Sequence, residues 1–405
     1  MTMTRIPIRR VAYRTAAAPA LVALAVWVAA CNTAPQRRVE IIDLPAPALS
    51  PSIVPNPPTS PAVVILPPGY RDTTRRYPVV YYLPGFVTGV TDYVDGSLGF
   101  RFDEALDDLV RSGATTEMVI VIANGRNGLG GSFYVNSPVT GRAEDHLLAD
   151  VVPQIESRYR VARDRAGRGI AGNGMGGFGA LNLAMRHPDV FGAVFAMNAA
   201  LFDEGGFDEE MLSAPLVRAW SLQRERMRSW PRDEAGERLA AYTRELYSAN
   251  GGFATFRGYV LAYAAAFAPN PDAGPPFADW PSRQDGGGVT FDPAVAERLR
   301  QGIGGWSEKA VMHRDGWVSL RGIGIDIGRD EGNAWILRGA RHLGQALHDA
   351  GIDAELTEHD GGEGGRLGDR IGGVMLPFFS RVFGTGIEAG AAGAAPGQPQ
   401  EPHHD

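Results

Sequence analysis

The sequence is poor in three features that would each narrow its class. It has one cysteine in 405 residues, Cys31, so no disulfide within the chain stabilises it. Its 39 basic and 46 acidic side chains are well mixed and give a net charge of −7, which excludes the basic stripe of a nucleic-acid-binding protein. No apolar run reaches the roughly 20 residues of a membrane span. A hydrophobic content of 44% nevertheless supports a large buried core.

The first thirty residues have the pattern of an export signal. An arginine-bearing start is followed by an apolar stretch over residues 16–28 and by two alanines directly before Cys31. Residues 28–31 resemble the bacterial lipoprotein box, in which the cysteine is lipidated. We therefore expect residues 1–30 to be a signal peptide and Cys31 to hold the protein on a membrane of the bacterial cell envelope, on its periplasmic or extracellular face. A transmembrane anchor and an ordinary cleaved signal are the alternatives, but the apolar stretch is short for a span.

Composition divides the rest of the chain. Residues 31–60 are rich in proline, which suits a tether or an edge segment. Residues 61–384 form the predicted folded domain. Within it, residues 202–315 are helical and polar with a Pro/Gly-rich centre, which predicts an insertion packed over the sheet edge. Residues 385–405 are mostly Gly, Ala, Pro and Gln, and we expect this tail to be disordered.

Short apolar runs in the predicted domain are typical of strands buried on both faces. Tyr77–Leu83 and Met118–Ala123 are two such runs, and helical spacing follows them in residues 102–112 and 146–159. Further strands are expected at 168–172, 190–197, 317–326 and 354–357, and further helices at 178–186, 334–350 and 374–383. This alternation predicts an α/β fold in which helices flank a mostly parallel central sheet.

A glycine-rich turn joins a predicted strand to a predicted helix at residues 172–177, Gly-Asn-Gly-Met-Gly-Gly. The context fits the pattern G-x-S-x-G, in which a sharp turn lifts a serine nucleophile above a sheet. Gly174 stands where that serine would be. Glycines alone are a weak signal, because any tight strand-to-helix connection can use them.

Four motifs in order along the chain make the signal specific. They are Pro67–Tyr70 with Tyr77–Phe86, then Arg168–Leu181, then His187–Phe191, and finally Asp360–Glu363 with Leu376–Phe379. Together they resemble the esterase family of α/β-hydrolases that includes esterase D, feruloyl esterases and the mycolyltransferases. The resemblance spans about residues 60–383 and implies an α/β-hydrolase fold without a cofactor or a metal ion.

The resemblance places the family's catalytic triad on unsuitable residues. The nucleophile position falls on Gly174 and the histidine position on Glu363. The acid falls on Glu331, with Asp330 one residue away as the alternative. Two further positions differ from the family pattern. Asn173 stands where relatives often have a histidine, and Pro84 stands where the family has a histidine.

The physical consequence is severe. Glycine has no side chain to attack a carbonyl, and a carboxylate with an ordinary pKa of about 4.3 is a poor base for a hydroxyl group. Loss of a triad serine or histidine costs roughly 10⁶ in turnover in a well-studied serine protease. We therefore expect little or no serine-esterase activity.

Stabilisation of an oxyanion needs only backbone N–H groups, so the substitutions leave it in place. By resemblance the donors are Phe86 and Met175, at the positive end of the following helix. A carboxylate or an ester carbonyl would dock there. The alternative is that Gly174 merely relaxes a strained turn.

The resemblance also brings Glu331 and Glu363 close together, and two adjacent carboxylates do not both ionise cheaply. Either one is protonated, or a cation lies between them, for which Arg329 or Arg366 is favoured over a metal ion because no histidine joins the group. His359, four residues before Glu363, is the remaining candidate for a base that activates water.

Three alternative functions are consistent with these sequence features. The first is a catalytically inactive, esterase-like envelope lipoprotein that binds a small ligand or a partner. The second is an active ester hydrolase or acyltransferase in which His359, Glu363 or Glu331 activates water. The third is a structural envelope protein that docks through its insertion.

Overall fold

The computed structural model describes residues 38–249, 252–285, 288–330 and 332–392, and Cys31 lies outside them. An eight-stranded sheet has the order β1-β2-β4-β3-β7-β8-β11-β12. Its strands are β1 (Val39–Pro45), β2 (Thr59–Ile65), β3 (Val79–Leu83), β4 (Val119–Ala123), β7 (Arg168–Asn173), β8 (Ala193–Met197), β11 (Gly322–Gly328) and β12 (Glu355–His359). The first two strands and β4 pair antiparallel, and the strands from β4 to β12 pair parallel.

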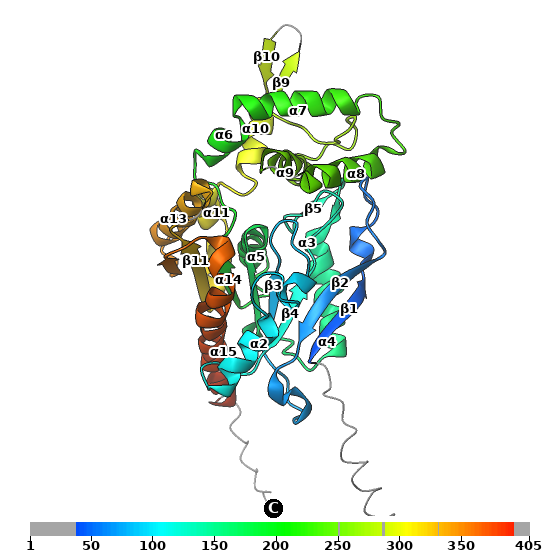
Figure 1. Ribbon diagram of the computed structural model, residues 1–405. Helices are drawn as coiled ribbons and strands as arrows, with labels where there is room; N and C mark the ends of the chain where they lie inside the picture. Colours follow the sequence, from blue (N-terminus) through cyan, green and yellow to red (C-terminus); the bar gives the residue numbers. More distant parts are fainter. Residues whose placement is uncertain (1–37, 250–251, 286–287, 331, 393–405) are drawn as a thin grey trace, which may run out of the picture. The chain divides into compact units, whose positions relative to one another are not determined.

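Helices cover both faces of the sheet (Figure 1). They are α2 (Phe102–Arg111), α3 (Ala143–Asp145), α4 (Val152–Arg158), α5 (Met175–Arg186), α13 (Ala334–Asp349), α14 (Glu363–Arg370) and α15 (Leu376–Ala392). Alternate residues of β3 point to opposite faces: Tyr81 joins the core under α4, α5 and α13, and Tyr82 joins the core under α2 and α15. Every residue of β3 and β4 is buried, as the continuous apolar runs predict.

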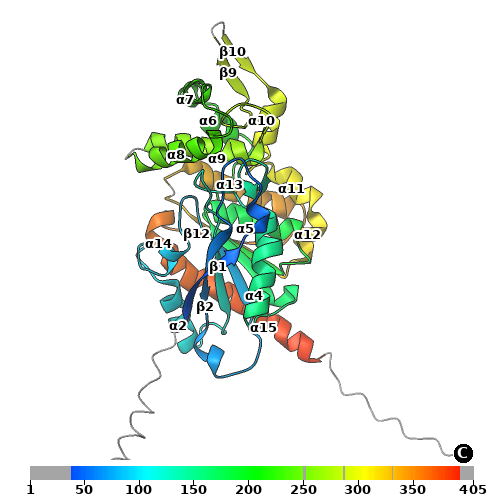
Figure 2. The same cartoon turned by 90° about the vertical axis from the view of Figure 1, so that its right-hand side faces the viewer.

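Between β8 and β11 the chain leaves the sheet. It forms α6 (Gly206–Met211), α7 (Ala214–Met227), α8 (Ala235–Ser248), α9 (Gly252–Phe267), α10 (Pro293–Arg300), α11 (Trp306–Met312) and α12 (Arg314–Ser319), with the hairpin of β9 (Ser282–Asp285) and β10 (Gly288–Phe291). A second small hairpin, β5 (Asn136–Ser137) with β6 (Gly141–Arg142), lies outside this insertion. Helices α7, α8 and α9 gather at one end of the sheet in both views (Figures 1 and 2). These three helices of the insertion therefore lie over one end of the sheet.

Several element boundaries differ from the sequence predictions. Residues 39–45 form β1, an edge strand paired on one side, where proline is tolerated; this agrees with the edge-segment alternative for residues 31–60 and not with a tether. Residues 317–319, expected as strand, end α12, since a short apolar run does not distinguish helix from strand. Helix α15 continues to Ala392, beyond the predicted start of the tail at 385, through residues that include several alanines.

In the described part of the chain no helix is both long and apolar enough to cross a membrane.

Candidate functional site

Gly174 forms the turn between β7 and α5. Its backbone has φ 54° and ψ −119°, a conformation that glycine adopts without strain and a side-chain-bearing residue does not. Its N–H donates to the Met197 carbonyl at 3.1 Å, and its carbonyl accepts from Ala200 N–H at 2.9 Å. The sharp strand-to-helix turn of the G-x-S-x-G pattern is thus fully built here, and a glycine occupies its tip.

The two neighbouring glycines of the motif permit a close backbone crossing. A Cβ on Gly176 would lie 1.8 Å from the Leu83 carbonyl oxygen, and a Cβ on Gly172 would lie 2.4 Å from the Gly176 carbonyl oxygen. The backbones of strand β7, helix α5 and the end of β3 are therefore in direct contact, with no side chain between them. This contact fixes the start of α5 beside the turn that follows β3.

The predicted oxyanion donors, Phe86 and Met175, both lie at this junction and line the same cavity. No described residue accepts a hydrogen bond from either N–H group. Met175 is the first residue of α5, a 12-residue helix whose positive end adds to the attraction for negative charge. The arrangement suits an oxygen that carries a full or partial negative charge.

A buried polar network that sequence reasoning missed holds the junction in place. Asn173 Oδ1 accepts from the hydroxyl groups of Tyr82, at 2.9 Å, and Tyr93, at 2.6 Å. The Tyr93 hydroxyl in turn accepts from the N–H of Gly85, next to Phe86, at 3.3 Å. These residues lie far apart in the sequence, and the only local signal was that Asn173 departs from the family's histidine. The network couples the end of β7 to the turn that presents Phe86.

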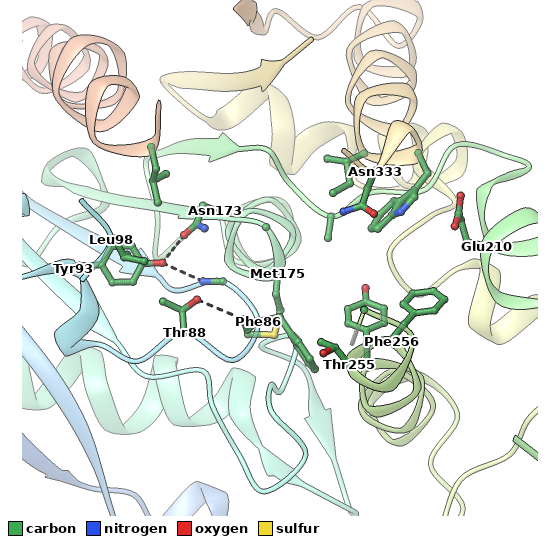
Figure 3. Close-up of a pocket in the computed structure, with 18 residues that line it drawn as sticks. Phe86, Thr88, Tyr93, Leu98, Asn173, Met175, Glu210, Thr255, Phe256 and Asn333 are labelled. Carbon is green, nitrogen blue, oxygen red and sulfur yellow. Dashed lines mark hydrogen bonds between the residues drawn. The ribbon is translucent and has the colours of Figure 1, made fainter. Parts of the chain in front are cut away.

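A cavity of about 850 Å³ opens above the glycine turn (Figure 3). The turn and the segment after β3 form one part of its lining, and α9 and the start of α13 form another. Phe256 and Tyr259 on α9, and Trp335 and Ile336 on α13, make much of that second part apolar. The volume is in the range of sites that hold small organic molecules.

The described residues that line the cavity supply few charged or nucleophilic side chains. Among the described residues that line it there is no serine, histidine or cysteine, and Glu210 is the one charged side chain. The Tyr259 hydroxyl is buried without a hydrogen-bond partner in the described residues. Burial raises the pKa of Tyr259 well above its usual value, so this hydroxyl stays a neutral donor.

The other triad positions are described in part. Glu331 lies outside the described residues, and for Glu363 only the backbone is described, as the first residue of α14. Asp330 accepts from Gly361 N–H at 3.0 Å, so it binds the loop that leads to Glu363. The contact between Glu331 and Glu363 stays a prediction.

Each of the two arginines considered as partners for that pair contacts Asp360. Arg329 pairs with the Asp360 carboxylate at 2.9 Å, and Arg366 donates to the Asp360 carbonyl at 3.1 Å. No group of three His, Cys, Asp or Glu side chains that could hold a metal ion occurs among the described residues.

His359 does not face the cavity. It is buried at the end of β12, where its Nε2 lies 3.4 Å from Asp326 Oδ2 and its Nδ1 donates to the Asp360 carbonyl at 3.0 Å. Arg370 also binds Asp326, with its Nε 3.0 Å from the carboxylate. Because His359 is not among the residues that line the cavity, its geometry does not support its candidacy as a base for hydrolysis there.

The sheet order and the strand-turn-helix at Gly174 define an α/β-hydrolase fold. A solved ferulic acid esterase shares this fold: it superposes with a TM-score of 0.52 at 21% identity, covering 85% of this chain and 98% of that one. Residues 59–234 match the model of the family described as "Putative esterase". The resemblance predicted from the motifs is confirmed over this part of the chain.

Curated relatives match a shorter segment. Esterase Rv1288 of Mycobacterium tuberculosis is 35% identical over 125 residues, which are 31% of this chain and 25% of that protein. An endo-1,4-beta-xylanase/feruloyl esterase of Xylanibacter ruminicola is 30% identical over 139 residues, 32% of this chain and 18% of the relative. The match thus spans about a quarter or less of the length of these relatives.

Proposed function

We propose that this protein binds a small ligand through an ester carbonyl or a carboxylate and does not hydrolyse it as a serine esterase would. One observation carries the proposal: Gly174 stands at the tip of an intact turn, beneath a cavity of about 850 Å³ that is also lined by Phe86 and Met175. Such a site keeps the groups that hold an acyl oxygen and has no side chain to attack the acyl carbon.

The preorganised groups of the site favour binding of a ligand over its hydrolysis. Two backbone N–H groups and the end of α5 are preorganised, so a ligand carbonyl gains hydrogen bonds without ordering new groups. The Tyr259 hydroxyl offers a further donor that no described residue uses. Hydrolysis would need a positioned base, and no histidine is among the described residues that line the cavity.

A matched pair of ligands tests the binding. Methyl phenylacetate has an ester carbonyl, and 2-phenylethyl methyl ether has the same apolar body without it. Isothermal titration calorimetry should show the ester bound about tenfold or more tightly, since each hydrogen bond to the carbonyl contributes about 1 kcal/mol. Equal affinities would show that the N–H groups of Phe86 and Met175 do not bind the ester carbonyl.

Turnover is tested with 4-nitrophenyl acetate, whose hydrolysis by the protein should stay near the rate in buffer. The competing function is an active hydrolase in which Glu363 or Glu331 activates water. A rate well above buffer that disappears in Glu363→Ala would establish that function and overturn ours.

The location in the cell envelope is a separate proposal. It rests on the export-signal pattern and on Cys31. When the full chain is expressed in bacteria, it should incorporate labelled fatty acid and sediment with membranes, and Cys31→Ser should abolish both. Fatty acid labelling that persists in Cys31→Ser would contradict it.

A further inference from the structure

The cavity has two ends of opposite polarity. At one end are the N–H groups of Phe86 and Met175 and the positive end of α5. Glu210, on α6, lies at the far side, across the cavity from Asn173 and Tyr93 (Figure 3). A ligand that fits both ends must therefore carry a negative or partly negative oxygen at one end and a complementary group at the other.

Negative charge is in excess around Glu210. Arg338 on α13 is one nearby cation, and its guanidinium is bound to Asp203 at 2.9 Å and to Glu209 at 2.6 Å; Arg300 is bound to Asp208 on α6 at 2.9 Å. The pKa of Arg338 is raised chiefly by its hydrogen bond with Asp203, and the charge of Glu210 contributes as well. Three carboxylates thus share one guanidinium, and no ion pair among the described residues involves Glu210. The group therefore has a net negative charge, and Glu210 is its one carboxylate without an ion pair among the described residues.

Aromatic rings line the cavity on the same side as Glu210. The rings of Phe256 and Tyr259 stack at 5.9 Å with an interplanar angle of 12°, and Trp335 lines the cavity from α13. Figure 3 shows Phe256 and Glu210 both on the side of the cavity away from Tyr93 and Asn173. The negative faces of aromatic rings attract cations, most strongly where water is partly excluded. An anionic carboxylate beside aromatic rings is the arrangement that recognises alkylammonium groups.

We propose that the ligand is an alkylammonium ester or betaine-type molecule, with its carbonyl oxygen at Phe86 and Met175 and its cationic group between Glu210 and the aromatic rings. This inference rests on the proposed binding function and adds the chemical class of the ligand. An anionic group at the Glu210 end would meet uncompensated negative charge. A purely apolar group would desolvate the Glu210 carboxylate without a partner, which is costly.

Two esters of the same shape test the inference. Butyrylcholine carries a quaternary nitrogen, and 3,3-dimethylbutyl butyrate carries a neutral carbon in its place. Titration calorimetry on the full protein should show butyrylcholine bound at least tenfold more tightly. Glu210→Gln should remove that advantage, because butyrylcholine loses its anionic partner and the neutral ester no longer desolvates a carboxylate and binds as tightly as before or more tightly. Glu209→Gln, on the same helix but bound to Arg338, is the matched control and should keep the preference.

The outcomes separate the two proposals. If both esters bind equally to the wild-type protein, the inference fails and the proposed carbonyl-binding function stands. If neither ester binds, both fail. A loss of preference in Glu209→Gln as large as in Glu210→Gln would also overturn the inference, because it would make the effect one of general charge. Circular dichroism of each variant verifies that the fold is retained.

Discussion

The hydroxyl group of Tyr93 donates to Asn173 Oδ1 at 2.6 Å, although the two residues lie 80 positions apart in the sequence. The same hydroxyl accepts from Gly85 N–H. One phenol therefore joins the end of β7, beside the glycine turn, to the segment that presents Phe86. The position of one oxyanion donor relative to the other depends on this bridge.

Tyr93→Phe should weaken both the fold and the binding. The change leaves the buried Gly85 N–H without its partner, so urea denaturation should show a free energy of unfolding lower by about 1–3 kcal/mol. The affinity for methyl phenylacetate should fall several-fold. Tyr77→Phe is the control, because buried Tyr77 donates to the Gly69 carbonyl at 2.8 Å and does not line the cavity. It should lower stability alone, and an unchanged affinity in Tyr93→Phe would refute the bridging role.

The double variant Gly174→Ser with Glu363→His should gain hydrolysis of 4-nitrophenyl acetate. Gly174 is already in the positive-φ conformation of a sharp strand-to-helix turn, and the N–H groups of Phe86 and Met175 are the proposed oxyanion donors. We expect the double variant to exceed either single variant by about 10² or more, since nucleophile and base act as a unit. Gly174→Ala should give no activity and cost about 1–2 kcal/mol of stability, because alanine resists a positive φ. If the double variant does not hydrolyse 4-nitrophenyl acetate, the geometry of the remaining triad positions is lost.

The sequence predicts the parts of the site that are local. Gly172 to Gly177 span the end of β7, the turn at Gly174 and the start of α5, so the strand, the turn and the helix follow from a short pattern, and the glycine in place of the pattern's serine is visible at Gly174. The oxyanion donors are also local, since Met175 follows the turn and Phe86 follows β3.

The cavity could not be predicted in the same way. Its aromatic lining comes from α9 and α13, and these helices approach the turn only through tertiary packing of the insertion, for which the sequence has no local pattern. Tyr82 and Tyr93 likewise look like ordinary core aromatics until the fold places them on Asn173. In the sequence, Glu210 is not distinguished from the other charged residues near it. Its place in the lining of the cavity is known only from the structure.

Stability should fall on mild acidification, in part through His146. Burial lowers the pKa of this histidine below its usual 6.5, while its hydrogen bond with Asp150 opposes the shift. The folded state thus holds His146 neutral, and the unfolded state takes up a proton as the pH falls through about 6.5, which favours unfolding. Urea denaturation at pH 7.5 and 5.5 should show this loss, and His146→Gln should reduce the difference. His348→Gln, at an exposed site, should leave it unchanged, and an equal effect of both variants would contradict the assignment.

Arg370→Met should destabilise the protein strongly. Arg370 binds the fully buried Asp326 carboxylate, so its removal leaves a buried charge with only His359 nearby, at a cost of about 3–5 kcal/mol. Arg381→Met is the matched comparison: Arg381 and Glu355 are both exposed, and breaking this pair should cost less than about 1 kcal/mol. Both values come from urea denaturation. Adding Asp326→Asn to Arg370→Met should recover much of the loss, because the unpaired charge is then gone. If the double variant were no more stable than Arg370→Met alone, packing of the arginine side chain would be the cause, and not the charge that it neutralises.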